Sequence, residues 1–114
     1  MLEAAGRLVA GARAAGVDVV HCIAARRPDG RGSNHNARLF AVAAKAGGQL
    51  TPGSEAVEVC PEIGIEPTDV VLTRLHGLGP MGGTDLDVVL RNLGATTVVG
   101  IGVSVNVGMT SFAF

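Results

Sequence analysis

The spacing of apolar residues changes along the chain, and these changes predict helices and strands in turn. The first segment repeats apolar residues at helical spacing, namely Leu2, Ala5, Leu8, Val9 and Ala12. Gly16 stands where a glycine would end that helix. Residues 17–23 are rich in β-branched side chains, which predicts a strand, and the polar residues 26–36, with a Pro-Asp-Gly turn signal, predict a loop.

The middle of the chain repeats this order. Residues 37–46 return to helical spacing, and two glycines then end the pattern. The proline-containing stretch 49–68 predicts a connector with one helical turn near 54–57. Residues 70–74 predict a second strand, which is followed by a glycine-rich loop at 76–83.

The last third predicts a helix, a third strand and the start of a further helix. Thr84 and Asp87 have the spacing of a capping box. The apolar stripe after it is formed by Leu86, Val89, Leu90 and Leu93, and Gly94 closes it. Residues 96–101 predict the strand, and the final helix is expected from about residue 106 to residue 114. Such alternation is typical of an α/β fold in which helices cover both faces of a parallel sheet.

Composition narrows the class of protein. The chain has 114 residues, enough for one domain at most, with 47% hydrophobic residues and a net charge of −1. A nucleic-acid-binding protein needs a surplus of Lys and Arg, so we expect no nucleic-acid partner. Cys22 and Cys60 are too few to cross-link a secreted mini-protein, and no signal peptide opens the sequence. We therefore expect reduced thiols in the cytoplasm.

The last 23 residues, 92–114, carry no charged side chain, so a membrane span has to be considered. Their Asn, Thr, Ser and Gly residues interrupt the apolar run that a span requires. We expect no membrane segment and interpret this stretch as a buried parallel strand followed by a buried helix.

Candidate chemistry is sought beyond the carboxyl ends of the strands, where open α/β sheets bind their ligands. After the first predicted strand, Cys22 could act as a nucleophile, or could join His21, Asp29 and His35 in a metal site. No spacing typical of a zinc site is present, so we expect no metal and interpret Cys22 as a small buried strand residue. Asp29 is interpreted as a turn former, and His35 as a surface or helix-start residue.

The second predicted strand ends at Arg74, two residues before His76. The Arg74 guanidinium could hold an anionic or carbonyl group of a substrate while His76 carries a proton, or Arg74 could simply pair with Asp85. Residues 100–108 combine a strand end, a tight turn and a helix start, whose free amides could bind an oxyanion. They do not match a dinucleotide fingerprint, and the chain has no G-K-[ST] phosphate loop, so no cofactor is expected.

Two stretches together carry a family pattern. Residues 69–111 are DVVLTRLHGLGPMGGTDLDVVLRNLGATTVVGIGVSVNVGMTS, and residues 16–34 are GVDVVHCIAARRPDGRGSN. With G-T-D-L-D, L-R-N-L-G and G-V-S-V-N at these intervals, the chain resembles the isochorismatase-like, or cysteine hydrolase, family, which includes nicotinamidases. The resemblance implies a three-layer α/β/α, Rossmann-like parallel sheet. It also implies a cysteine that attacks an amide or related carbonyl group, assisted by an aspartate and a lysine.

The family's functional residues are matched only in part. Arg74 stands at the position of the lysine, and Gly108 at that of the nucleophilic cysteine, which removes covalent catalysis. The resemblance places a cis peptide bond between Val103 and Ser104, and the oxyanion-binding amides at Ser104 and Gly108. The further candidates for a substrate pocket are His76 and Asn106.

The resemblance also implies a longer domain, of which residues 1–114 are a part. The family's first strand, with its aspartate, and its last strands and helices are expected outside this chain, and the isolated segment is expected to be marginally stable or prone to aggregate. Oligomers are common in the family, so a homo-oligomer is expected for the full-length form.

Two hypotheses about function stay open. One is a hydrolase of small amide-type or ether-type molecules, in which Cys22 or Cys60 supplies a thiol to the turn at 104–108. The other is a non-catalytic homologue that binds a small carboxylate or carboxamide molecule, or serves as an assembly subunit. The glycine at position 108 favours the second, with water attack assisted by Arg74 as a remaining route to hydrolysis.

Overall fold

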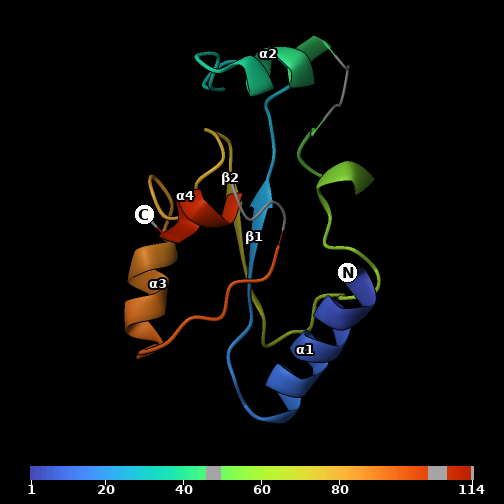
Figure 1. The fold of residues 1–114 in the computed structure, drawn as a ribbon, viewed down its shortest axis with the longest axis vertical. Coiled ribbons are helices and arrows are strands. Elements are labelled where there is room, and N and C mark those ends of the chain that lie inside the picture. Colours follow the sequence, from blue (N-terminus) through green and yellow to red (C-terminus); the bar gives the residue numbers. More distant parts are fainter. Residues whose placement is uncertain (46–49, 103–107, 114) are drawn as a thin grey trace.

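The computed structural model describes residues 1–45, 50–102 and 108–113, and a parallel pair of strands lies at its centre with helices on either side and one helix at the end of the molecule (Figure 1). In chain order the described elements are α1 (Leu2–Ala14), β1 (Val20–Ala24), α2 (Arg38–Lys45), the 3₁₀ helix η1 (Glu55–Val57), β2 (Val70–Arg74), α3 (Leu86–Asn92) and α4 (Thr110–Ala113). The expected α/β class with a Rossmann-like parallel sheet is confirmed.

Two glycines end helices as their positions in the sequence predict. After α1, Gly16 has a φ of 71°, its amide donates to the Arg13 carbonyl at 3.1 Å, and the Val17 amide donates to the Ala12 carbonyl at 2.9 Å. After α3, Gly94 has a φ of 70°, its amide donates to the Arg91 carbonyl at 3.0 Å, and the Ala95 amide donates to the Leu90 carbonyl at 3.0 Å. This is the Schellman motif, in which a residue with left-handed backbone angles lets the next amides bond to the last carbonyl groups of the helix. Glycine adopts these angles readily, whereas a residue with a Cβ is strained in them.

The two strands run parallel, with Val20 opposite Val70 and Ala24 opposite Arg74. The first strand starts later than expected, because the Val17 amide is already bonded in the α1 cap and cannot join the ladder. Pairing begins where the Val70 amide donates to the Val19 carbonyl at 3.0 Å. The second strand has the predicted bounds.

The predicted strand at 96–101 is wrong. In the described part of the chain, sheet pairing joins only β1 and β2, and every residue of 95–102 is exposed. A β-branched segment becomes a strand only when a neighbouring strand supplies hydrogen-bond partners, and none of the described segments does so here. The segment instead meets the chain ahead of α4, where Gly100 packs against the Met109 side chain. The expected helix from about 106 is described only from residue 108 onward.

The capping box predicted at Thr84 and Asp87 is not formed, because the helix cap lies one residue later, at Asp85, whose side chain makes no cap hydrogen bond. The Thr84 hydroxyl accepts a hydrogen bond from the Leu86 amide at 3.2 Å and donates to the Pro80 carbonyl. The Asp87 carboxylate does not reach back to the helix start, because Arg91 one turn later holds it with its Nε at 3.1 Å from both oxygens. An ion pair along the helix therefore holds the carboxylate that the box would need.

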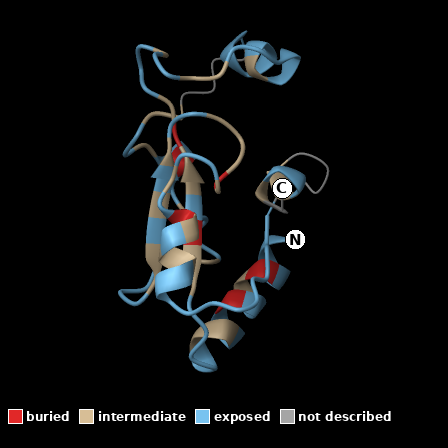
Figure 2. Cartoon of the chain, turned by 90° about the vertical axis from the view of Figure 1, so that its left-hand side faces the viewer, coloured by how far each residue is buried: buried red, intermediate tan, exposed pale blue. Residues whose placement is uncertain are grey.

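Buried apolar side chains are few and scattered over several elements (Figure 2). They belong to Ala5, Val9, Ala25, Val57 and Leu86. Leu86 is therefore the one residue of the predicted α3 stripe that is fully buried, and Leu93 at its end is 39% exposed. Among the described residues, no helix has the length and apolar character that crossing a membrane requires.

Candidate functional site

Arg74 lies at the carboxyl end of β2 and is held by backbone carbonyl groups. Its Nε donates to the Gly77 carbonyl at 2.9 Å, and its Nη1 donates to the Cys22 carbonyl on β1 at 3.2 Å. The main chain adds a bond from the Ala25 amide to the Arg74 carbonyl at 2.9 Å. The guanidinium is thus fixed across both strands at the edge where the sequence predicts the site.

The positive charge of Arg74 has no carboxylate partner among the described residues, so the suggested pair with Asp85 is wrong. Partial burial lowers the pKa of Arg74 from its ordinary value, and the nearby Cys22 side chain opposes this. Arginine nevertheless keeps its charge at neutral pH. A half-buried cation bonded only to neutral carbonyls can still bind an anion or a polarised carbonyl oxygen.

Cys22 is exposed, which corrects the interpretation that it is a buried strand residue. It lies on the same face of the sheet as Arg74. Surrounding protein atoms nevertheless desolvate the thiol enough to raise its pKa, against the attraction of the Arg74 charge. Because the thiolate is the reactive form, this environment does not activate Cys22 as a nucleophile.

The glycine-rich loop at 76–83 brings other segments to the same edge. A Cβ built on Gly79 would lie 2.7 Å from the Ser111 Oγ, so α4 contacts this loop closely. A Cβ on Gly77 would lie 4.0 Å from the Asn34 side chain, which belongs to the loop after β1. The loop after β1, the loop after β2 and α4 therefore converge beyond the strand ends, as Figure 1 shows. Sequence reasoning missed Ser111 and Asn34, because nothing in the local pattern marks either residue.

His76 and Gly108 lie within the described residues of this region. The His76 ring is exposed and packs against Gly83, where a Cβ would lie 3.3 Å from the ring Nε2 and the φ is +73°. Gly108 lies in the wide helical turn that leads into α4. The other predicted members, Val103, Ser104 and Asn106, lie outside the described residues.

The residues considered for a metal site are not gathered together. Asp29 binds Arg27 at 2.6 Å and accepts from the Arg31 amide at 3.1 Å, which confirms it as a turn former, and the Arg27 side chain lowers the pKa of Asp29 to about 2. His35 is exposed, and His21 is buried beside another carboxylate. In the described stretches, no three His, Cys, Asp or Glu side chains are grouped as a metal would need.

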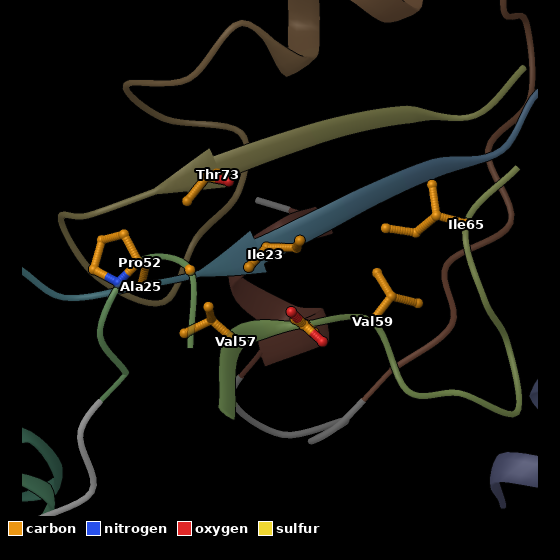
Figure 3. Close-up of a pocket in the computed structure, with 9 residues that line it drawn as sticks. Ile23, Ala25, Pro52, Val57, Val59, Ile65 and Thr73 are labelled. Carbon is orange, nitrogen blue, oxygen red and sulfur yellow. The ribbon is translucent and has the colours of Figure 1, made fainter. Parts of the chain in front are cut away.

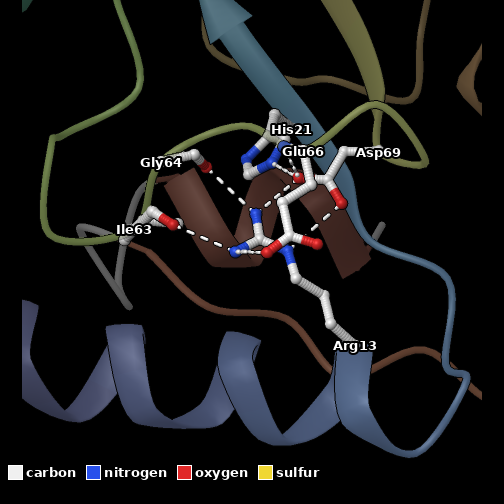
Figure 4. Close-up of polar contacts among 6 residues, drawn as sticks. All are labelled: Arg13, His21, Ile63, Gly64, Glu66 and Asp69. Carbon is white, nitrogen blue, oxygen red and sulfur yellow. Dashed lines mark hydrogen bonds and ion pairs between the residues drawn. The ribbon is translucent and has the colours of Figure 1, made fainter.

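A second polar cluster, which sequence reasoning missed, lies at the opposite, amino end of the strands (Figure 4). The Asp69 side chain is 1% exposed and lies 2.5 Å from Arg13 Nη2 and 2.9 Å from His21 Nε2. Arg13 also donates to the carbonyls of Ile63 and Gly64, each at 3.1 Å. The Arg13 guanidinium holds the pKa of Asp69 well below its usual range. Through these contacts Arg13 and Asp69 tie α1, β1 and the segment before β2 together, so we interpret the cluster as one that stabilises the fold.

The fold agrees with comparisons to known proteins. A model of the isochorismatase domain matches residues 1–114, so the chain belongs to the isochorismatase family. YwoC, an isochorismatase family protein of Bacillus subtilis strain 168, is 37% identical over 67 residues, which are 59% of this chain and 35% of YwoC.

Solved structures show the same likeness over almost the whole chain. N-carbamoylsarcosine amidase from Thermoplasma acidophilum is 27% identical with a TM-score of 0.78, over 98% of this chain and 58% of the amidase. A cysteine hydrolase from Pseudomonas syringae pv. phaseolicola 1448A is 26% identical with a TM-score of 0.81, over 96% of this chain and 50% of that protein. This chain therefore spans little more than half the length of these solved relatives.

Proposed function

We propose that this isochorismatase-family domain binds a small amide or carboxylate compound beyond the carboxyl ends of β1 and β2, without covalent cysteine catalysis. The observation that carries the proposal is the placement of Arg74, a half-buried cation at the strand end whose partners are two neutral carbonyls. A ligand oxygen there would form a charge-assisted hydrogen bond, which is stronger than one between neutral groups.

Two features support binding without a thiol nucleophile. Position 108, where the family resemblance places the nucleophilic cysteine, is glycine. Desolvation raises the pKa of Cys22, the thiol nearest to Arg74 in the ladder, and so keeps it in its unreactive form. In this proposal Arg74 stabilises the ligand's oxygen, and the amides of Ser104 and Gly108, at the turn after Val103, complete its binding. We propose His76 and Asn106 as further members of the ligand pocket, and this proposal, like the roles of Ser104 and Gly108, rests on the family resemblance.

The names of the solved relatives support the ligand class, since one is an amidase and another a cysteine hydrolase. Both cysteines are free thiols, which supports a cytoplasmic, reducing location. No cofactor enters the proposal, because the chemistry it describes needs only a cation and amide donors.

A second candidate is an assembly subunit whose main role is association with other chains. The observation that favours it is α2, none of whose residues is buried within the chain. In that case a homo-oligomer forms whether or not a ligand occupies the strand ends.

Ligand binding can be measured by NMR titration of the labelled chain with benzoate and benzamide as probes. We expect Arg74→Met to weaken benzoate binding by about tenfold or more, the effect of losing a hydrogen bond to a charged group. Arg74→Lys should weaken it less, because the charge remains while the fork geometry is lost. The control Arg7→Met, an exposed cation on α1, should bind benzoate as the unmodified chain does.

Reactivity separates the two hypotheses about catalysis. We expect no benzamide hydrolysis that depends on a thiol, so that iodoacetamide treatment and Cys22→Ser leave any turnover unchanged. Turnover abolished by Cys22→Ser would overturn the proposal, and turnover insensitive to thiol blocking but lost in Arg74→Met would assign water attack near Arg74. If neither probe binds, the assembly role is the better description.

A further inference from the structure

Charged residues are unevenly divided between two segments of the chain. The basic lobe, residues 26–45, carries five of the nine Lys and Arg residues and one of the ten Asp and Glu residues. The acidic connector, residues 50–69, carries five acidic residues and no basic one. The net charge of the chain is therefore close to zero although one segment is strongly basic and another is strongly acidic.

Most of these charges form no ion pair with another described residue. In the acidic connector, Glu66 and Asp69 pair with Arg13, whereas the exposed Glu55, Glu58 and Glu62 form no ion pair with a described residue. In the basic lobe, Arg27 pairs with Asp29 at 2.6 Å. The cations there without an ion pair among the described residues are Arg26, Arg31, Arg38 and Lys45.

The helix of the basic lobe presents an unpartnered face that is both apolar and basic. Leu39 is 50% exposed and Val42 is 56% exposed, and neither contributes to a core. Arg38 and Lys45 lie four residues before and three residues after Val42, so all four side chains share one side of α2. Figures 1 and 2 both show α2 standing clear of the sheet at one end of the molecule. A helix of eight residues is marginal in water and is stabilised mainly by burying an apolar face.

The acidic connector forms one wall of an apolar pocket on the sheet (Figure 3). The pocket has a volume of about 200 Å³, and Ile23 and Thr73 of the two strands face Val57, Val59 and Ile65 of the connector. Glu58 also lines it, and Ile65 is 52% exposed. This surface is therefore apolar in its centre and acidic at its margin, which complements the exposed face of α2 in both respects.

We infer that α2 of one copy docks on this pocket of a second copy, with Leu39 and Val42 over the apolar residues and Arg38 and Lys45 beside Glu55 and Glu58. The chain carries both surfaces, so a twofold pair forms the contact twice, which is the closed arrangement that homodimers favour. Burial of the α2 face supplies the apolar contribution, and the opposite charges select the partner and its orientation. The inference does not depend on what binds near Arg74.

A charge exchange tests the contact directly. Variant A carries Arg38→Glu with Lys45→Glu, and variant B carries Glu55→Lys with Glu58→Lys. Each variant alone places like charges at both contacts, so by sedimentation we expect its dimer dissociation constant to rise by about tenfold or more above that of the unmodified chain. An equal mixture of A and B makes both contacts complementary again, so the mixture should regain dimerisation as an A–B pair.

Further measurements keep the inference falsifiable. Glu3→Lys with Arg7→Glu, a matched charge exchange on α1, should dimerise as the unmodified chain does. In a Cys22→Ser background, a spin label on Cys60 should broaden the NMR signals of Leu39 and Val42 in a separately labelled second copy. The inference is overturned if the unmodified chain stays monomeric, if A alone and B alone dimerise normally, or if their mixture does not recover. Salt-sensitive binding of the basic lobe to anionic vesicles or an oligonucleotide, with no self-association, would assign it a different partner.

Discussion

Asp69 connects the segment before β2 to α1 and β1, which lie far from it in the sequence. Its buried carboxylate accepts hydrogen bonds from Arg13 of α1, from His21 of β1 and from the Glu66 amide at 3.0 Å. Asp69→Asn keeps the shape but leaves the Arg13 charge without its partner. We expect this change to lower the free energy of unfolding by about 3 kcal/mol in urea denaturation, the usual cost of breaking a buried pair.

The matched control for Asp69 is a second Asp–Arg pair at the surface. Asp87 and Arg91 lie one turn apart on α3, with side chains 50% and 76% exposed. Because exposed pairs contribute little, Asp87→Asn should leave the urea midpoint unchanged within error. Equal losses in the two variants would show that the Asp69 cluster does not stabilise the fold as its burial suggests.

Acid also tests the charge of Asp69. The folded chain holds the pKa of this carboxyl below its unfolded value, so the folded state binds fewer protons than the unfolded state in acid. The stabilisation is present above the unfolded pKa of about 3.9 and is lost as the pH falls through it toward the lower folded value. We expect the urea midpoint to fall less between about pH 6 and pH 3 in Asp69→Asn than in the unmodified chain. Parallel decreases in the two proteins would contradict this assignment.

At the scale of single residues, sequence reasoning finds a group whose role follows from its place on a strand. Arg74 is such a group, because a strand end in a parallel sheet is a ligand edge whatever surrounds it. The exposure of Cys22 could not be predicted in this way, because the exposed fraction of a strand residue depends on whether another layer covers that face of the sheet. The Asp69 cluster could not be predicted either, because its partners lie 48 and 56 residues away.

The contact between α1 and the connector can be tested with two glycines of one helix. A Cβ on Gly6 would lie 2.7 Å from the Glu62 carbonyl oxygen, whereas a Cβ on Gly11 would meet nothing within 4 Å. Gly-to-Ala changes inside an open helix stabilise by up to about 1 kcal/mol. We expect Gly11→Ala to raise the melting temperature and Gly6→Ala to lower it, because the backbone must move to admit the methyl group. If both changes stabilise the protein, the close packing of α1 on the connector is wrong.

Elements that depend on local chemistry could be predicted, and those that depend on distant partners could not. Helix α1 and its end at Gly16 follow from apolar spacing and a left-handed cap, both of which are local. Strand β2 was predicted with its bounds, and it has a neighbour in β1. Residues 96–101 are also rich in β-branched side chains, but no described segment pairs with them as a neighbouring strand. Composition thus predicts the capacity to form a strand, while the partner decides whether one forms.

At the scale of the whole molecule, apolar surface is more prominent than the core. Among the described residues, the buried apolar side chains are those of two alanines, two valines and one leucine, whereas the large apolar side chains left exposed include Leu8, Val42, Val88 and Val99. A chain that buries so little on its own gains stability from any partner that binds the folded state and not the unfolded one. The α2 contact inferred above is one such source, and it makes stability depend on concentration.

Thermal unfolding at several protein concentrations tests this dependence. For a dimer that unfolds to two free chains, a tenfold rise in concentration should raise the melting temperature of a chain of this size by about 3 °C. The monomeric variant with Arg38→Glu and Lys45→Glu should lose this dependence while keeping its helical circular dichroism, because the reversed charges act only at the contact. A melting temperature that falls with concentration in both proteins would instead indicate aggregation through unpaired strand edges and exposed apolar side chains. In that case the exposed face of α2 would not be a specific dimer contact.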